Sequence, residues 1–65
     1  MFTALLEPDS QAITIINCDN PDLPYYEQGK ETIAKGHKKK VMEKIEEWYE
    51  DNFVPDELRI VQIVT

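Results

Sequence analysis

Only one segment of this chain, residues 32–52, repeats apolar residues at the spacing of an amphipathic helix. The residues of this stripe recur three or four positions apart and so share one helix face: Ile33, His37, Val41, Ile45 and Trp48. Thr32 is the expected N-cap. The other apolar segments are short and rich in β-formers. A chain with one long helix and several strands falls in the α+β class, in which the helix covers a sheet.

The expected strands occupy residues 2–7, 12–17, 25–29 and 58–64. The first two are joined by Glu-Pro-Asp-Ser, which has proline where a type I turn favours it, so they form a β-hairpin. A meander followed by a right-handed crossover gives the sheet order 3-2-1-4, with the last strand parallel to the first. We therefore expect one β-β-β-α-β domain over residues 1–65, with the helix on one face of a four-stranded sheet.

The last strand is apolar on both faces, which predicts cover on both sides of the sheet. Val61 and Ile63 lie on one face of this strand, and Leu58, Ile60 and Val64 lie on the other. Because a single helix covers only one face of the sheet, the opposite face is expected to meet a second copy or a partner. The sequence thus predicts a dimer or tetramer in which Val61 and Ile63 take part.

Length and composition restrict the kinds of protein that this chain is expected to be. At 65 residues the chain is one small domain, and its single cysteine cannot form an internal disulfide. The longest uncharged run, residues 10–18, is too short to cross a bilayer, and residues 1–9 lack the basic residues of a signal peptide. A cytoplasmic protein is the expectation.

The net charge of −6 is unevenly distributed. Residues 1–29 contain five acids and no base, and residues 45–65 contain six acids and one arginine. Between them, residues 30–44 contain six lysines and two glutamates. An acidic chain is repelled by phosphate, so a basic protein is a better expected partner than nucleic acid. The lysines of residues 35–44 leave nucleic-acid binding as the weaker alternative.

The residue types that support catalysis or metal binding are scarce. Cys18 and His37 could form a nucleophilic pair, but no third residue is evident to orient them. One cysteine and one histidine do not make a zinc site, and Asp19, Asp22 and Glu27 lack the spacing of a calcium loop. We expect no enzyme activity, no cofactor and no metal, with His37 as a half-buried packing residue.

A proline-framed loop and the residues after it carry the expected partner site. Tyrosines are enriched at the energetic centres of interfaces, and carboxylates would attract a basic partner. The expected contact residues are Asp19, Asp22, Leu23, Tyr25, Tyr26 and Glu27.

Several short motifs together resemble one family. These are Leu-Glu-Pro-Asp at residues 6–9, Pro-Asp-Leu-Pro at residues 21–24, Gln28-Gly29 and the threonine at position 32. In order and spacing this pattern is similar to the N-terminal domain of HicB-type antitoxins. The resemblance implies a partial RNase H-like fold, oligomerisation, and binding and occlusion of a small basic ribonuclease toxin of the HicA type.

The chain departs from that family at several positions. Tyr25-Tyr26 stands where the family usually has Gly-Cys, and the expected helix begins Ile-Ala-Lys-Gly rather than with acids. Family members also carry a C-terminal DNA-binding domain, which is not expected within residues 1–65. Residues 33–45 alone look like the last helix of a SAM domain, but the strands expected before them disfavour that fold. A small viral or bacterial regulator that inhibits another basic protein stays open as an alternative.

Overall fold

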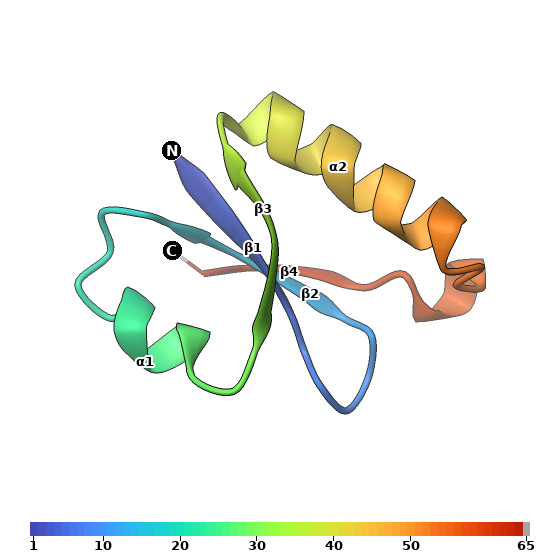
Figure 1. The fold of residues 1–65 in the computed structure, drawn as a ribbon, viewed down its shortest axis with the longest axis horizontal. Helices are drawn as coiled ribbons and strands as arrows, with labels where there is room; N and C mark the ends of the chain where they lie inside the picture. The colour runs from blue at the N-terminus through green and yellow to red at the C-terminus, as the bar shows by residue number, and fades with distance from the viewer. Residues whose placement is uncertain (65) are drawn as a thin grey trace.

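Four short strands and one long helix make up most of the protein (Figure 1). The computed structural model describes residues 1–64. Its elements are β1 (Phe2–Leu6), β2 (Ile13–Asn17), α1 (Leu23–Glu27), β3 (Glu31–Gly36), α2 (Lys38–Asp51), the 3-10 turn η1 (Asp56–Leu58) and β4 (Val61–Val64). The predicted α+β class, with a four-stranded sheet and one main helix, is confirmed.

The predicted hairpin is confirmed, with strands slightly shorter than expected. β1 and β2 pair antiparallel from Phe2↔Asn17 to Leu6↔Ile13. The backbone N–H of Glu7 donates to the carbonyl of Ala12 at 2.8 Å and closes the turn. The Pro-Asp-Ser sequence inside this turn leads the chain back without continuing either strand.

The strand expected at residues 25–29 is wrong, because the chain forms α1 there. Two asparagine side chains accept backbone N–H groups two residues ahead, from Asp19 to Asn17 and from Asp22 to Asn20, both at 2.8 Å. These turns prepare a helix start, and Pro24 fits its first turn because proline needs no N–H partner there. The third strand is instead β3, which follows Gly29.

The helix expected over residues 32–52 begins later, at Lys38, and ends as predicted near Asn52. Thr32 is therefore not its N-cap, and Ile33 and Ala34 are strand residues that pack on the core. Gly36 has a φ of 149°, a conformation that residues with a Cβ rarely adopt, and it turns the chain from β3 into α2. His37 lies at the N-cap and is exposed, so its predicted packing role is wrong.

The central strands are exchanged relative to the expected order 3-2-1-4. The sheet order is β3-β1-β2-β4, β3 pairs antiparallel with β1, and β4 pairs parallel with β2 rather than with β1. The last strand is also shorter than residues 58–64, because η1 occupies its expected beginning. The connection from β2 to β3 and the connection from β3 to β4 are therefore both crossovers, because each joins two strands that run in the same direction.

The two crossovers run across the sheet in opposite directions. Right-handed crossovers of opposite direction place their connecting segments on opposite faces of a sheet. Figure 1 shows α2 on one side of the strands and α1 on the other. The segment of residues 18–30, which connects β2 to β3, thus accounts for the second face that the sequence left uncovered.

On the first face, α2 packs an apolar stripe onto the sheet. Val41, Ile45 and Tyr49 are buried against a layer from the central strands: Ala4, Ile13 and Ile15. Fully burying a valine or isoleucine side chain contributes roughly 1.5–3 kcal/mol. This layer is the main core of the protein.

On the second face, side chains of the central strands are also buried. Leu5 and Ile16 alternate with the residues that face α2, and both have an exposed fraction of 0%. Thr3 and Thr14 share this face and are buried as well. The expectation that this face of the central strands needs a second copy or a partner is therefore wrong.

Candidate partner-binding site

The predicted partner-binding residues lie together on the segment that connects β2 to β3. Asp19 is in the turn after β2 and Asp22 immediately precedes α1. The other four residues form or lie within α1: Leu23, Tyr25, Tyr26 and Glu27. None of the residues of α1 is fully buried: Tyr25 is exposed, whereas Leu23, Tyr26 and Glu27 are half-buried.

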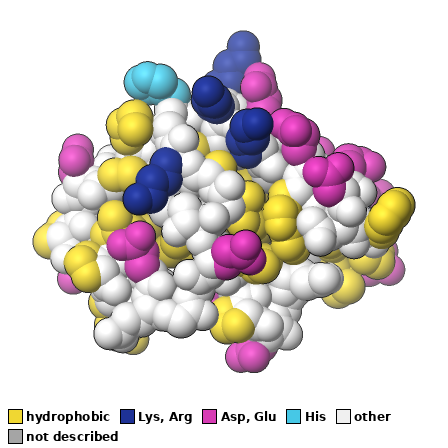
Figure 2. Space-filling model, in the orientation of Figure 1, with side chains coloured by type: hydrophobic (Ala, Val, Ile, Leu, Met, Phe, Trp, Pro, Cys, Tyr) yellow, Lys and Arg dark blue, Asp and Glu magenta, His cyan; other side chains and the backbone are white. Residues whose placement is uncertain are grey.

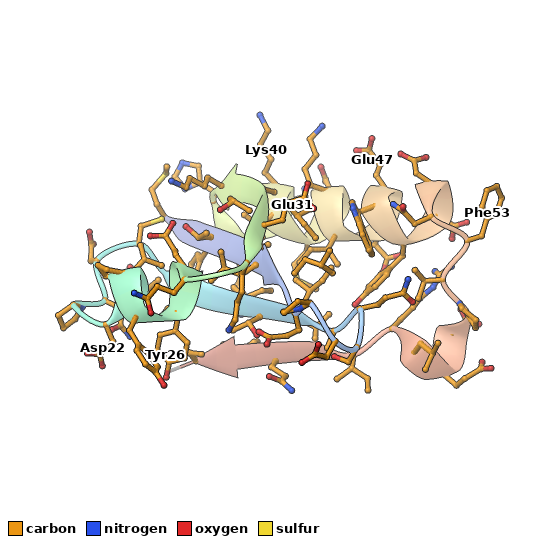
Figure 3. The ribbon with its side chains drawn as sticks, turned by 60° about the horizontal axis from the view of Figure 1, so that its bottom comes forward. Asp22, Tyr26, Glu31, Lys40, Glu47 and Phe53 are labelled. Atoms are coloured by element: carbon orange, nitrogen blue, oxygen red, sulfur yellow. The ribbon has the colours of Figure 1, made fainter. Side chains whose placement is uncertain are left out.

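The two tyrosines of α1 differ in exposure. Tyr25 is 75% exposed, whereas Tyr26 is half-buried. Their rings meet edge to face, with centroids 5.6 Å apart and an interplanar angle of 82°. Figure 3 shows Asp22 and Tyr26 on the side of α1 that faces away from α2. The ring of Tyr25 thus forms an exposed aromatic surface that packs against the ring of Tyr26.

A polar cluster anchors this segment to the end of the hairpin. Lys30 Nζ lies 2.8 Å from Glu7 Oε2, and the hydroxyl of Thr14 donates to the same oxygen at 2.7 Å. Lys30 Nζ is also 5.8 Å from the ring centroid of Tyr26, within cation–π range. The hydrogen bonds from Lys30 and Thr14 hold the pKa of Glu7 below its usual value. Glu7 therefore helps to fix the position of α1.

A second acidic surface, at the C-terminal half of α2 and at η1, was not among the predicted sites. Its exposed acids are Glu46, Glu47, Glu50, Asp51, Asp56 and Glu57. Phe53 projects beside them with 89% of its surface exposed and a φ of 53°. This residue holds the position after a helix C-cap where glycine is usual. The aromatic residue directly after the end of the expected helix was the sequence signal from which this surface could have been predicted.

The lysines gather at the other end of α2. Figure 2 shows them near the single histidine, with the acids of α2 beyond them. Lys35, Lys38, Lys39 and Lys40 are exposed and form no ion pair with the rest of residues 1–64, whereas Lys44 pairs with Glu47 at 3.7 Å. α2 thus runs from a basic to an acidic end, against its own dipole.

The two residues predicted for self-association lie on β4, at the edge of the sheet. Val61 is half-buried and packs against the main core, whereas Ile63 is 53% exposed. Both share the face of the sheet that α2 covers, because they pair with Ile13 and Ile15. α2 therefore shields Val61 more than Ile63.

The residues weighed for chemistry are dispersed. The Sγ of Cys18 lies 3.0 Å from the hydroxyl of Thr3, on the second face, whereas His37 is exposed at the start of α2. Within residues 1–64 there is no cluster of three or more metal-ligating side chains and no pocket. None of the described helices has the length and apolar character needed to span a bilayer.

Comparison of the chain with protein-family models, curated proteins and solved structures gave no significant match.

Proposed function

We propose that this protein is a non-enzymatic binding protein that occludes a small basic protein. In the most specific form of the proposal, the protein is a cytoplasmic HicB-like antitoxin and its partner is a HicA-type ribonuclease toxin. The HicB-like motifs at residues 6–9 and 21–24 support the choice of partner. Inhibition of another basic protein by the same surface is the alternative within this class.

The observation that carries the proposal is the composition of the surface around α1. Asp19, Asp22 and Tyr25 are exposed on one short segment, and the chain as a whole has a net charge of −6. The carboxylates would speed the encounter with a basic partner, while Tyr25 and Leu23 would slow its release. Since Glu7 and Lys30 hold the segment in place, little ordering would be needed on binding.

The test is binding to a catalytically inactive HicA-type toxin, measured by surface plasmon resonance at several salt concentrations. We expect the association rate to fall as salt rises, because screening weakens the attraction between exposed charges. Tyr25→Ala should raise the dissociation constant at least about tenfold through a faster release. An association rate that does not change with salt would contradict the electrostatic part of the proposal.

A matched pair of variants separates the α1 surface from overall charge. Asp19→Asn with Asp22→Asn removes two charges beside α1, and Glu46→Gln with Glu47→Gln removes two from the exposed surface of α2. We expect the first pair to slow association more than the second. If the α2 pair has the larger effect, the partner binds the acidic surface beside Phe53, and the site proposed here is wrong.

Nucleic-acid binding is the second candidate, and the lysine cluster favours it. Lys35, Lys38, Lys39 and Lys40 lie at one end of α2, where the helix dipole also attracts anions. This function predicts retention on a heparin or RNA column at low salt and loss of retention in Lys38→Gln with Lys39→Gln. The proposed antitoxin-like function predicts that the protein flows through.

A further inference from the structure

The two edges of the sheet differ in how they are protected against pairing with another strand. Edge strands of natural proteins usually carry charges or bulges that discourage such pairing. β3 has both, because it contains Glu31 and Lys35 and its register against β1 shifts between Ala4 and Leu5. β4 has neither: Val61–Val64 is uncharged, and its pairing with β2 is regular.

The free edge of β4 offers the backbone groups of two residues. The N–H of Ile13 donates to the carbonyl of Ile60 at 2.9 Å, and Ile13 pairs with Val61 in the parallel register. In a parallel ladder, alternate residues of a strand point their N–H and C=O to the same side. Gln62 and Val64 therefore point these groups toward β2, as Ile60 points its carbonyl. Val61 and Ile63 direct their N–H and C=O groups outward, away from the sheet.

The sequence of this strand is symmetrical in residue type about Gln62. β-Branched aliphatic residues lie on both sides of it, in the order Ile60, Val61, Gln62, Ile63, Val64. If a second copy pairs antiparallel about Gln62, Val61 lies opposite the partner's Ile63, and each Gln62 lies opposite its equivalent. This register is the one that uses the outward groups of both Val61 and Ile63, since the pair exchanges its N–H and C=O groups.

We propose that the protein forms a two-fold homodimer in which the β4 edges pair antiparallel about Gln62 and join the two sheets into one. The occupant is a second copy because the strand matches itself, apolar side chain against apolar side chain and amide against amide. Ile60 and Ile63, which are 51% and 53% exposed in the single chain, lose water-exposed surface in this pairing. The uncharged edge gives a charged partner little to recognise, so the inference does not rest on the proposed function.

The test is sedimentation equilibrium of the whole chain, followed by charge substitutions at Gln62, which is exposed. We expect a concentration-dependent dimer. In Gln62→Lys two like charges would face each other at the two-fold axis, and the dissociation constant should rise at least about tenfold. Gln62→Glu should have the same effect. Mixing the two variants should restore dimers in the form of one-to-one heterodimers, detected by native mass spectrometry.

Thr32→Lys is the matched control, because it adds the same charge to an exposed position on the opposite edge, β3. This variant should dimerise like the wild-type chain, and circular dichroism should show an unchanged fold in every variant. A wild-type chain that stays monomeric up to about 1 mM would overturn the proposal. A dimer that tolerates Gln62→Lys, or a Lys and Glu mixture that stays monomeric, would overturn it equally.

Discussion

The two faces of the sheet are covered in different ways. α2 covers one face with a continuous apolar stripe, in which Val41 and Ile45 are almost completely buried. The segment of residues 18–30 covers the other face, where polar contacts from Thr3, Thr14 and Glu7 accompany the buried Leu5 and Ile16. The same central strands are thus protected by a continuous apolar stripe on one side, and on the other by a smaller apolar layer together with hydrogen bonds and an ion pair.

The two layers are expected to differ in how readily they open. Segments with few buried apolar contacts open at lower free energy than core elements. α1 has no buried residue, whereas α2 has three: Val41, Ile45 and Tyr49. We therefore expect the α1 segment to open locally while α2 and the hairpin stay folded. The proposed partner-binding residues therefore lie in the less stable of the two layers.

The largest expected effect comes from truncating the apolar layer. Ile45→Ala removes a side chain that is 1% exposed in the centre of the main core. It should lower the free energy of unfolding by about 2–5 kcal/mol, measured by urea denaturation. Met42→Ala, on the exposed side of the same helix, is the control and should change stability by less than about 1 kcal/mol. Equal losses in both variants would mean that α2 does not pack as described.

A smaller effect, with a pH signature, is expected from the polar layer. The folded-state pKa of Glu7 lies below its usual value of 4.5, so Glu7 stabilises the fold above that value. This contribution should be lost as the pH falls through the lowered pKa. In Glu7→Gln the loss of stability between neutral and acidic pH should be smaller than in the wild-type chain. Hydrogen exchange should also speed up over residues 18–30 more than in α2.

An even increase in exchange over the whole chain in Glu7→Gln would contradict the expected difference in stability between the two layers. Asp9→Asn is the control, since Asp9 lies exposed in the nearby turn and makes no ion pair with the described residues. It should leave the exchange pattern of residues 18–30 unchanged.

The smallest effect comes from removing one hydrogen bond of the apolar layer. The hydroxyl of Tyr49 donates to the carbonyl of Ile60 at 3.2 Å, and Tyr49→Phe should cost about 0.5–1.5 kcal/mol. Burial raises the pKa of Tyr49 above 10.0, so its neutral form stabilises the fold below pH 10 and this contribution is lost at higher pH. The phenylalanine variant should show a shallower alkaline loss in thermal melts. An identical alkaline limb in both proteins would contradict this assignment.

Local sequence signals predicted the elements whose residues decide their own conformation. The Glu-Pro-Asp-Ser turn fixed the hairpin, and the apolar stripe from Val41 to Trp48 fixed the position and the end of α2. Ile33 and Ala34 fit the same stripe by spacing, yet pairing with β1 places them in a strand. Tertiary pairing overrode helical periodicity there, and Gly36 was the signal of the boundary.

The strand order could not be predicted, because it depends on where residues 18–30 pass. With α1 unrecognised, these residues were expected to lead directly into a strand beside β2. Recognising Pro24 as a helix start would have allowed a crossover, and a crossover places β3 beyond β1. One missed helix therefore led to both the exchanged strand order and the uncovered face. The six predicted contact residues still share one segment, because they are close in sequence.

The parallel pairing of β4 with β2 has a consequence for the protein during its synthesis. β4 follows every other described element along the chain. β2 therefore cannot pair with β4 until the ribosome has also made α2 and η1. Long-range parallel pairings also form slowly, because a long loop must close before any contact is gained. During that interval the outer side of β2 is open to strands of other chains. Accurate folding of the nascent protein therefore depends on how quickly β4 pairs with β2.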